Sequence, residues 1–275
     1  MTQTKRQNAS SAPAPVAALL LPLVIPALGF AASGCGSEPA RLPAGETHHE
    51  VEGAAERLLV FTKTSGWRHD SIEAGVAAVK KLASENGFSL THTEQAGYFT
   101  PENLSRYQAV LFLNTTETVF TNDAQRQAFK AFIQNGGGFA GVHSATDTEY
   151  EWPWYGGLVG AYFSNHPNNP NVRRAVIEVV NRDHPSTRHL PERWEREDEW
   201  YNFSFISQAT EVLLRLDTDS YEGSDHPGNH PVAWYHAYDG GRAFYTALGH
   251  TRESFEEPLF LEHLLGGILY ALGRH

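Results

Sequence analysis

Sulfur is scarce in this sequence: its 275 residues include one cysteine and one methionine. A single cysteine can form neither a disulfide framework nor a zinc site built on cysteine. Cations are also few, since 21 Lys and Arg face 32 Asp and Glu, for a formal net charge of −11. A surface that acidic repels phosphate backbones, and no basic stripe offsets it, so we expect no nucleic-acid partner. Charged residues make up only 19%, and 41% are hydrophobic, which predicts a folded chain with its own core.

Common nucleotide and metalloprotease motifs are missing as well. The chain has no P-loop and no HExxH. Residues 136–141, GGGFAG, satisfy G-x-G-x-x-G, but a dinucleotide fingerprint follows a strand and opens a helix. This copy follows a predicted helix and enters a predicted strand. We therefore predict no NAD site and expect the glycines to end the helix and to allow close packing.

The N-terminus has the pattern of a secretory signal. Lys5 and Arg6 precede an uncharged, mostly apolar run over residues 16–33, which ends just before Cys35. The ending Ala-Ser-Gly-Cys resembles a bacterial lipobox, in which the cysteine becomes the lipidated first residue. We predict a lipoprotein signal at 1–35, a flexible tether at 36–56, and location in the bacterial cell envelope through a lipid anchor in the membrane. An ordinary cleaved signal and an uncleaved anchor are the alternatives.

From residue 57 onward, strands and helices alternate. Short apolar runs predict strands at 58–62, 88–94, 109–114 and 139–143. Helices are predicted between them, from an N-cap at Asp70 to about residue 86 and from a cap at Thr121 or Asn122 to residue 134. This order predicts a doubly wound, mostly parallel sheet whose ligands lie beyond the carboxyl ends of its strands. Further elements follow: strands at 174–180 and 212–216, a hairpin over 231–238 and 242–248, and a closing helix at 258–272.

Residues 141–145, GVHSA, follow the fourth predicted strand in the layout of a nucleophile elbow. A serine hydrolase would need serine at the position of His143, and Ser144 is one residue too late. A histidine presented on that turn can act as a general base, an electrostatic stabiliser or a metal ligand. A structural histidine tucked under a loop is the alternative.

Several blocks in one order resemble the trehalose-utilisation (ThuA-like) family, a branch of the class I glutamine amidotransferase-like fold. The resemblance covers roughly residues 57–274. The matching blocks are Phe61 to Ile72, Gly136 to Ala145, Asp147, His166-Pro167, His184-Pro185, Asp198 to Tyr201, Pro231 to Trp234, Gly241-Arg242 and Gly249-His250. The resemblance implies a flavodoxin-like sheet and a link to the breakdown of oxidised (keto) disaccharides or glycosides. Glutamine amidotransfer is excluded, because that reaction needs a cysteine where this chain has His143.

The placement of polar residues predicts one site at the carboxyl edge of the sheet. His69 follows the first strand, His143 follows the fourth, and His250 ends the hairpin's second strand. Glu199 lies in an acidic, aromatic stretch of the kind that binds sugar hydroxyls and sugar faces, although a solvated surface segment is the alternative. We predict catalytic roles for His69, His143 and Glu199. Substrate-binding roles are predicted for Ser144, Asp147, His166, Asp198, Trp200, Tyr201 and His250.

The sequence is compatible with three functions. The leading one is a lipid-anchored protein that cleaves or rearranges a (keto-)glycoside or disaccharide in sugar catabolism, with a sugar-oxidising dehydrogenase as a partner. The second is a carbohydrate-binding lipoprotein without catalysis. The third is a metal-dependent hydrolase of another substrate class, with zinc or a similar divalent ion held by His69, His143 and His250. No closely spaced ligand pair supports a metal, so such ligands would converge only in three dimensions.

Overall fold

A ten-stranded sheet organises the chain in the computed structural model, which describes residues 46–274. The predicted signal at 1–35, its lipidation site Cys35, and the tether up to residue 45 lie outside the described residues. Within the described part of the chain, no helix is both long enough and apolar enough to cross a membrane.

Five neighbouring strands form the parallel half of the sheet, in the order β3-β2-β4-β5-β12. Their central members are apolar and buried, as expected for strands covered on both faces. The prediction of a mixed α/β fold around a large sheet with a parallel centre is therefore confirmed. The bounds are β2 Arg57–Phe61, β3 Ser89–Thr93, β4 Ala109–Leu113, β5 Gly138–Val142 and β12 Gly241–Thr246.

The other half of the sheet is antiparallel and runs β12-β11-β10-β7-β8. Its bounds are β7 Val172–Val179, β8 Arg193–Glu199, β10 Glu211–Leu216 and β11 His230–Tyr238. A separate two-stranded sheet pairs β6 Ala161–Asn165 with β9 Asn202–Ile206. The sequence did not predict β8, because its charged residues suggested a solvated segment. Alternate side chains of β8 are in fact buried, among them the ion-paired Arg196 and Asp198.

The edge of the sheet corrects the predicted tether. Residues Thr47–His49 form β1, which pairs antiparallel with β3 through Thr47–His92, His48–Thr91 and His49–Leu90. The polar, proline-rich and glycine-rich stretch before them suggested a linker throughout. Backbone pairing at an edge strand needs little burial, so the composition did not indicate it.

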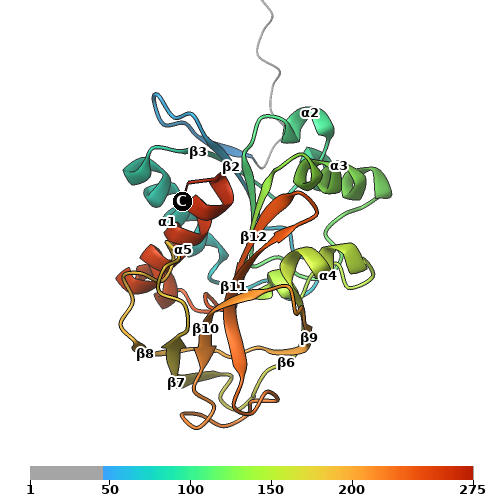
Figure 1. The fold of residues 1–275 in the computed structure, drawn as a ribbon. Coiled ribbons are helices and arrows are strands. Elements are labelled where there is room, and N and C mark those ends of the chain that lie inside the picture. The colour runs from blue at the N-terminus through green and yellow to red at the C-terminus, as the bar shows by residue number, and fades with distance from the viewer. Residues whose placement is uncertain (1–45, 275) are drawn as a thin grey trace, which may run out of the picture. The chain divides into compact units, whose positions relative to one another are not determined.

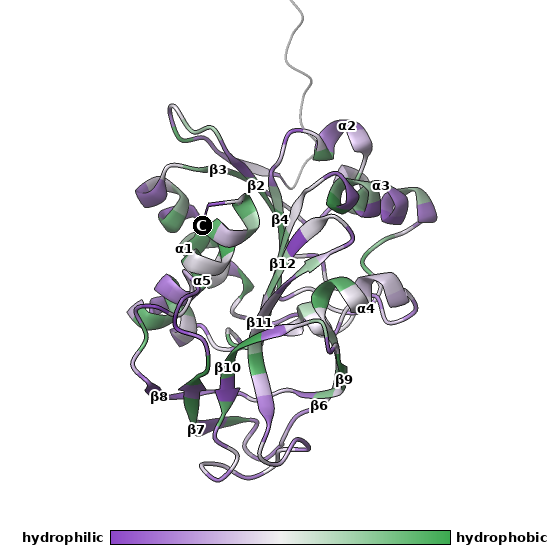
Figure 2. Ribbon diagram, viewed as in Figure 1, coloured by the Kyte–Doolittle hydropathy of each residue, from purple (hydrophilic) through white to green (hydrophobic). Residues whose placement is uncertain are grey.

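Helices cover both faces of the parallel half (Figure 1). The helices α1 Ile72–Asn86 and α5 Pro258–Leu272 lie on one face, and α3 Asp123–Gln134 and α4 Pro153–Val159 lie on the other, with the short α2 Pro101–Leu104 beside α3. Asn122 caps α3 as predicted, whereas the N-cap of α1 is Ser71 instead of Asp70. Figure 2 shows that the residues of α5, which packs against β12, β5 and β4, are mostly hydrophobic, while hydrophilic residues prevail on α3.

The glycine run at 136–138 has the packing role that we predicted. Gly136 follows α3 with a φ of 90°, which favours glycine. A Cβ on Gly138 would lie 1.9 Å from the carbonyl oxygen of Ala271, so only glycine lets β5 approach α5 this closely. The glycines therefore end α3 and allow close contact between β5 and α5.

Candidate functional site

Three histidines and one glutamate converge at the carboxyl edge of the parallel strands. His69 lies in the loop after β2, His143 directly follows β5, His250 follows β12, and Glu199 is the last residue of β8. Each offers one ligand-type atom, and these atoms all lie within 4.8 Å of one another. We call these four residues the His3Glu cluster. It joins three residues of the parallel half with one from the far edge of the antiparallel half.

The closest part of the cluster is a triangle of three atoms. Nδ1 of His250 lies 3.1 Å from Oε2 of Glu199, and Nε2 of His143 lies 3.4 Å from the same oxygen. The two histidine nitrogens are 3.2 Å apart. The ring of His69 packs edge-on against both imidazoles, with centroid distances of 4.9 Å to His143 and 5.2 Å to His250. Two nitrogens and one oxygen therefore point at a common centre, with a third imidazole beside it.

His143 is held in place by its backbone and by its outer nitrogen. Its φ of 48° lies in the left-handed region, which is uncommon for residues other than glycine and recurs at functional turns. The hydroxyl of Tyr245 donates to the His143 carbonyl at 2.7 Å. Nδ1 of His143 lies 2.8 Å from the Ala247 carbonyl oxygen. Because a carbonyl only accepts, Nδ1 carries a proton, and Nε2 is the nitrogen that faces the cluster.

The other members also have outer partners. Asn171 donates through Nδ2 to Oε1 of Glu199 at 2.8 Å, and the same nitrogen lies 3.4 Å from Nε2 of His250. Nδ1 of His69 lies 3.4 Å from Oγ of Ser144. Each member of the cluster thus has a polar neighbour on the side that faces away from the centre. Such neighbours orient reactive or ligating groups.

Burial and mutual contact set the charges in the cluster. Burial, together with the nearby His143 and His250, lowers the pKa of His69 to about 2, so this ring is neutral at ordinary pH. Burial alone would raise the pKa of Glu199, but its hydrogen bonds with His143 and His250 outweigh burial and hold that pKa below its usual range. Burial lowers the pKa of His250, and Glu199 more than reverses this effect, so the net change is upward. Glu199 is therefore a carboxylate at neutral pH.

A cavity of about 630 Å³ opens onto the cluster. His69, Glu199 and His250 line it, so these three members can meet a ligand directly. His143 is fully buried and does not line the cavity, so a substrate there meets the other three members first. The remaining lining residues are Trp67, Arg68, Asp70, Asp147, Phe163, His166, Asn168, Asn171 and Tyr201.

Three of the predicted substrate-binding residues line this cavity beside the cluster. Nε2 of His166 lies 3.5 Å from Oε1 of Glu199, and the Tyr201 ring packs at a tilt against His143 with a centroid distance of 4.1 Å. Asp147 accepts a hydrogen bond from the Tyr150 hydroxyl at 2.6 Å. Burial raises the pKa of Asp147 to about 6.

Three other predicted substrate-binding residues do not line the cavity. Asp198 is fully buried and accepts hydrogen bonds from backbone N–H groups. Trp200 is buried as well, and its indole donates to the Arg173 carbonyl at 2.8 Å. Ser144 is buried behind His69. Alternation along β8 explains the first of these corrections, since neighbouring residues of a strand point to opposite sides.

The sequence did not predict three residues of the cavity wall: Trp67, Phe163 and Asn171. Trp67 is 74% exposed at the cavity, in the loop between β2 and α1. Phe163 packs against the predicted Tyr201 with a centroid distance of 4.2 Å. Asn171 contacts Glu199 as described above. The run Ser65-Gly66-Trp67 before His69 was a usable signal, because a tryptophan in a polar loop has no core to enter.

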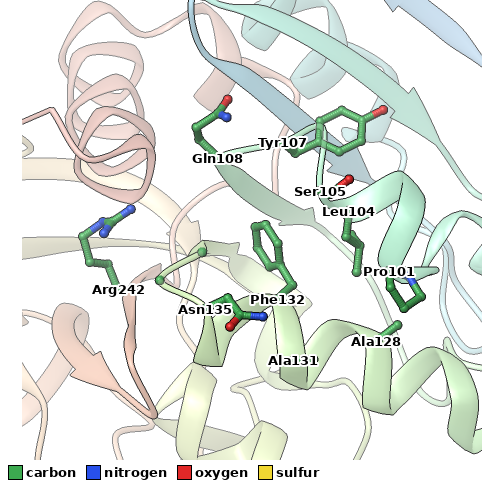
Figure 3. A pocket seen from close by; sticks show the side chains of 12 residues that line it. Pro101, Leu104, Ser105, Tyr107, Gln108, Ala128, Ala131, Phe132, Asn135 and Arg242 are labelled. Carbon is green, nitrogen blue, oxygen red and sulfur yellow. The ribbon is translucent and has the colours of Figure 1, made fainter.

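A second cavity, of about 350 Å³, lies at the opposite edge of the sheet, between α2, α3 and the start of β12 (Figure 3). Its lining includes Leu104, Tyr107, Phe132 and Arg242. None of the predicted site residues lines it. Parallel sheets bind their ligands at the carboxyl ends of the strands, which favours the cavity at the His3Glu cluster as the functional one.

Comparison with known proteins supports the family resemblance. The family profile described as ThuA, trehalose utilisation, matches residues 57–271 and indicates a role in sugar utilisation. A ThuA-like protein from Bacteroides uniformis is 24% identical, with a TM-score of 0.67 over 85% of this chain and 95% of that one. One from Parabacteroides merdae is 17% identical, with a TM-score of 0.63 over 80% and 91%. At these identities the two structures show the shared fold alone. No curated protein matches the sequence.

Proposed function

Since the chain belongs to the ThuA (trehalose utilisation) family, we propose that it acts on a carbohydrate in the cavity above the His3Glu cluster, by cleaving or rearranging a (keto-)glycoside or disaccharide. One observation carries the proposal: the Glu199 carboxylate and three imidazoles, of His69, His166 and His250, line a cavity whose wall also presents an exposed tryptophan. Proton-transfer groups and a sugar-stacking surface thus meet in one space.

The cavity wall suits a sugar. An exposed indole such as Trp67 offers a flat apolar face to the C–H bonds of a pyranose ring, and Phe163 and Tyr201 extend the aromatic surface. Side chains that can form hydrogen bonds with sugar hydroxyls also line the cavity. They are the amides of Asn168 and Asn171, the carboxyl group of Asp147 and the imidazole of His166.

The cluster suits general acid–base chemistry. Glu199 is ionised and can accept a proton, and His250 lies beside it with an upward-shifted pKa, so it can return one. With a keto-glycoside, Glu199 would take a proton from the carbon next to the carbonyl. The electron pair of that C–H bond would form a C=C bond as the glycosidic C–O bond breaks, and the leaving oxygen would take a proton from His250. His143 stabilises this pair from the buried side.

Turnover assays test this proposal. The panel consists of trehalose, simple glycosides and their 3-keto derivatives, and the variants are Glu199→Gln and Glu197→Gln. Both glutamates lie on β8, but Glu197 is exposed and does not line the cavity. We expect Glu199→Gln to lower kcat by at least about 100-fold and Glu197→Gln to leave it unchanged. Equal turnover by the wild type and Glu199→Gln would overturn the proposal.

Exposed Trp67 also favours a second candidate function, a carbohydrate-binding protein without catalysis. It predicts saturable sugar binding with no product, weakened by Trp67→Ala and unaffected by Glu199→Gln. Calorimetric titration with the same panel separates the two functions.

We further propose that Cys35 carries a lipid that anchors the chain in the bacterial envelope, where a sugar-oxidising dehydrogenase supplies the keto-sugar. The sequence pattern at residues 32–35 supports this part. Fractionation of cells that express the full chain tests it, with Cys35→Ser as the variant. We expect the wild type in the membrane fraction and the variant released from it; equal membrane association of both would argue against the anchor.

A further inference from the structure

We infer that the His3Glu cluster is a binding site for a divalent transition-metal ion, with His69, His143, His250 and Glu199 as its protein ligands. The inference deepens the proposed function and rests on it for the role of the ion, whereas binding itself follows from the geometry of the four side chains. Imidazole and carboxylate are the donors that zinc and its neighbours use.

The spacing of the triangle matches a tetrahedral site. Zinc lies about 2.0–2.1 Å from nitrogen and oxygen donors, which places two ligands of a tetrahedron roughly 3.3 Å apart. The three atom pairs between His143, His250 and Glu199 measure 3.2, 3.1 and 3.4 Å. His69 has its ligand atom within 4.8 Å of the others and needs only a small approach to complete the set.

The contacts of His143 also orient its ring for such a site. Its Nδ1 lies 2.8 Å from the Ala247 carbonyl oxygen, which leaves Nε2 as the nitrogen that faces Oε2 of Glu199 at 3.4 Å.

Outer contacts support the same conclusion. Metal-ligating histidines generally use their second nitrogen to contact a carbonyl, carboxylate or water, and these outer contacts fix the ring for the metal. His143 has the Ala247 carbonyl in this place, His69 has Ser144, and Glu199 has Asn171 on its other oxygen.

The ion would face the sugar cavity, because three of its four ligands line that cavity. In that place it would act as a Lewis acid on a hydroxyl or carbonyl oxygen of the substrate, which would enter from the cavity as a fifth ligand. With Nδ1 of His250 bound to the ion, this polarisation would replace proton donation by His250 in the proposed cleavage. This position distinguishes the site from a structural ion enclosed by protein on all sides.

Zinc binding to the purified full-length chain, without a polyhistidine tag, tests the inference. Elemental analysis and calorimetric titration of the metal-free protein are expected to give one ion per chain. Glu199→Gln and His69→Ala are expected to weaken zinc by more than the about 10- to 100-fold that follows loss of an outer partner. His48→Ala removes an exposed histidine on β1 and is expected to leave affinity unchanged. No stoichiometric binding by the wild type, or equal affinity in all variants, would overturn the inference.

Two further readouts keep the test decisive. Zinc is expected to raise the Tm of the wild type and not that of Glu199→Gln, which separates loss of the site from loss of the fold. X-ray absorption at the zinc edge of the wild type needs no variant and is expected to show nitrogen and oxygen neighbours only; a sulfur neighbour would contradict the site. Metal binding without sugar turnover would reject the proposed function alone, and turnover by metal-free protein would reject the metal alone.

Discussion

The carboxylate of Asp198 holds the backbone of His250: its Oδ1 accepts a hydrogen bond from the His250 N–H at 3.1 Å. Its Oδ2 accepts a second from Gly249 at 2.9 Å and pairs with Arg196 at 3.1 Å. Asp198 and Glu199 are neighbours in β8 and therefore have different roles on its two sides. Glu199 enters the His3Glu cluster, and Asp198 fixes the loop that carries another member of it.

The first prediction concerns this positioning role. Asp198→Asn removes the charge that Arg196 pairs with and weakens the hold on the His250 loop. We expect a stability loss of about 3 kcal/mol and zinc affinity about 10- to 100-fold lower. Calorimetric zinc titration of the folded variant checks this, with exposed Asp219→Asn as the control. Unchanged zinc affinity would mean that Asp198 has a structural role only.

The second prediction concerns the contact between β5 and α5. Gly138→Ala forces a Cβ to 1.9 Å from the backbone oxygen of Ala271, which cannot move without shifting the helix. We expect the free energy of unfolding to fall by about 3 kcal/mol, measured by urea denaturation. Gly97→Ala is the matched control, since nothing lies within 4 Å of its added Cβ. Equal stability of the two variants would show that the contact is not as tight as described.

The third prediction concerns a buried carboxylate outside the site. Glu149 is buried, accepts hydrogen bonds from the N–H groups of Val119 and Phe120 at 2.9 Å each, and pairs with Arg126 at 2.8 Å. Glu149→Ala leaves these donors unpaired, and we expect a loss of about 3–5 kcal/mol in thermal or urea unfolding. The exposed pair of Glu102 and Arg106 provides the control. There Glu102→Ala is expected to cost at most about 0.5 kcal/mol, and a similar loss in both variants would refute the prediction.

The fourth prediction is a pH dependence. Burial raises the pKa of Asp147 to about 6 from an ordinary value of 3.8. Between these values the folded chain holds a proton that the unfolded chain releases, so this group makes stability fall as pH rises from about 4 to about 6. Asp147→Asn removes that penalty. We expect the variant to be about 1–2 kcal/mol more stable than the wild type at pH 8 and to gain nothing at pH 3.5, as urea unfolding at both values would show. An equal gain at both pH values would assign the effect to packing.

The fifth prediction separates binding from catalysis. Trp67→Ala removes the exposed aromatic face at the cavity, so sugar binding is expected to weaken about 10-fold with kcat unchanged. Phe205→Ala is the control, because Phe205 is also an exposed aromatic but does not line the cavity. Sugar titration and steady-state kinetics provide the measurements. A fall in kcat without a change in KM would place Trp67 in the chemistry instead.

The sequence predicted the parallel half of the fold well, because buried parallel strands are short apolar runs and helices begin and end at recognisable residues. β2 and β4 follow this pattern, and Asn122 caps α3 as expected. The sequence did not predict β8, because its inward-facing residues include the paired charges Arg196 and Asp198, and charged residues in a sequence usually indicate a surface position. The sequence did not predict β1 either, because backbone pairing at the edge of a sheet requires no particular amino-acid composition.

The site was predictable where it follows from topology. Parallel strands end at one edge, so His69 and His143 were expected to meet, and they do. That Glu199 joins them depends on how β8 returns across the sheet, which no local pattern specifies. Asp198 and Trp200, its neighbours, were assigned to the sugar on composition alone. Alternation along β8, which the sequence did not predict, turns Asp198 away from the cavity, and the Trp200 indole donates to the Arg173 carbonyl instead. Trp67 and Asn171 carry no spacing signal.

The most direct test of the central claim, that the His3Glu cluster is a metal centre facing the sugar cavity, is an anomalous difference map at the zinc edge from crystals of the full chain grown with zinc. We predict one strong peak between His69, His143, His250 and Glu199, at about 2.0–2.1 Å from each ligand atom and open to the sugar cavity. A map with no peak at the cluster, or with zinc only at exposed histidines such as His48, would contradict the account.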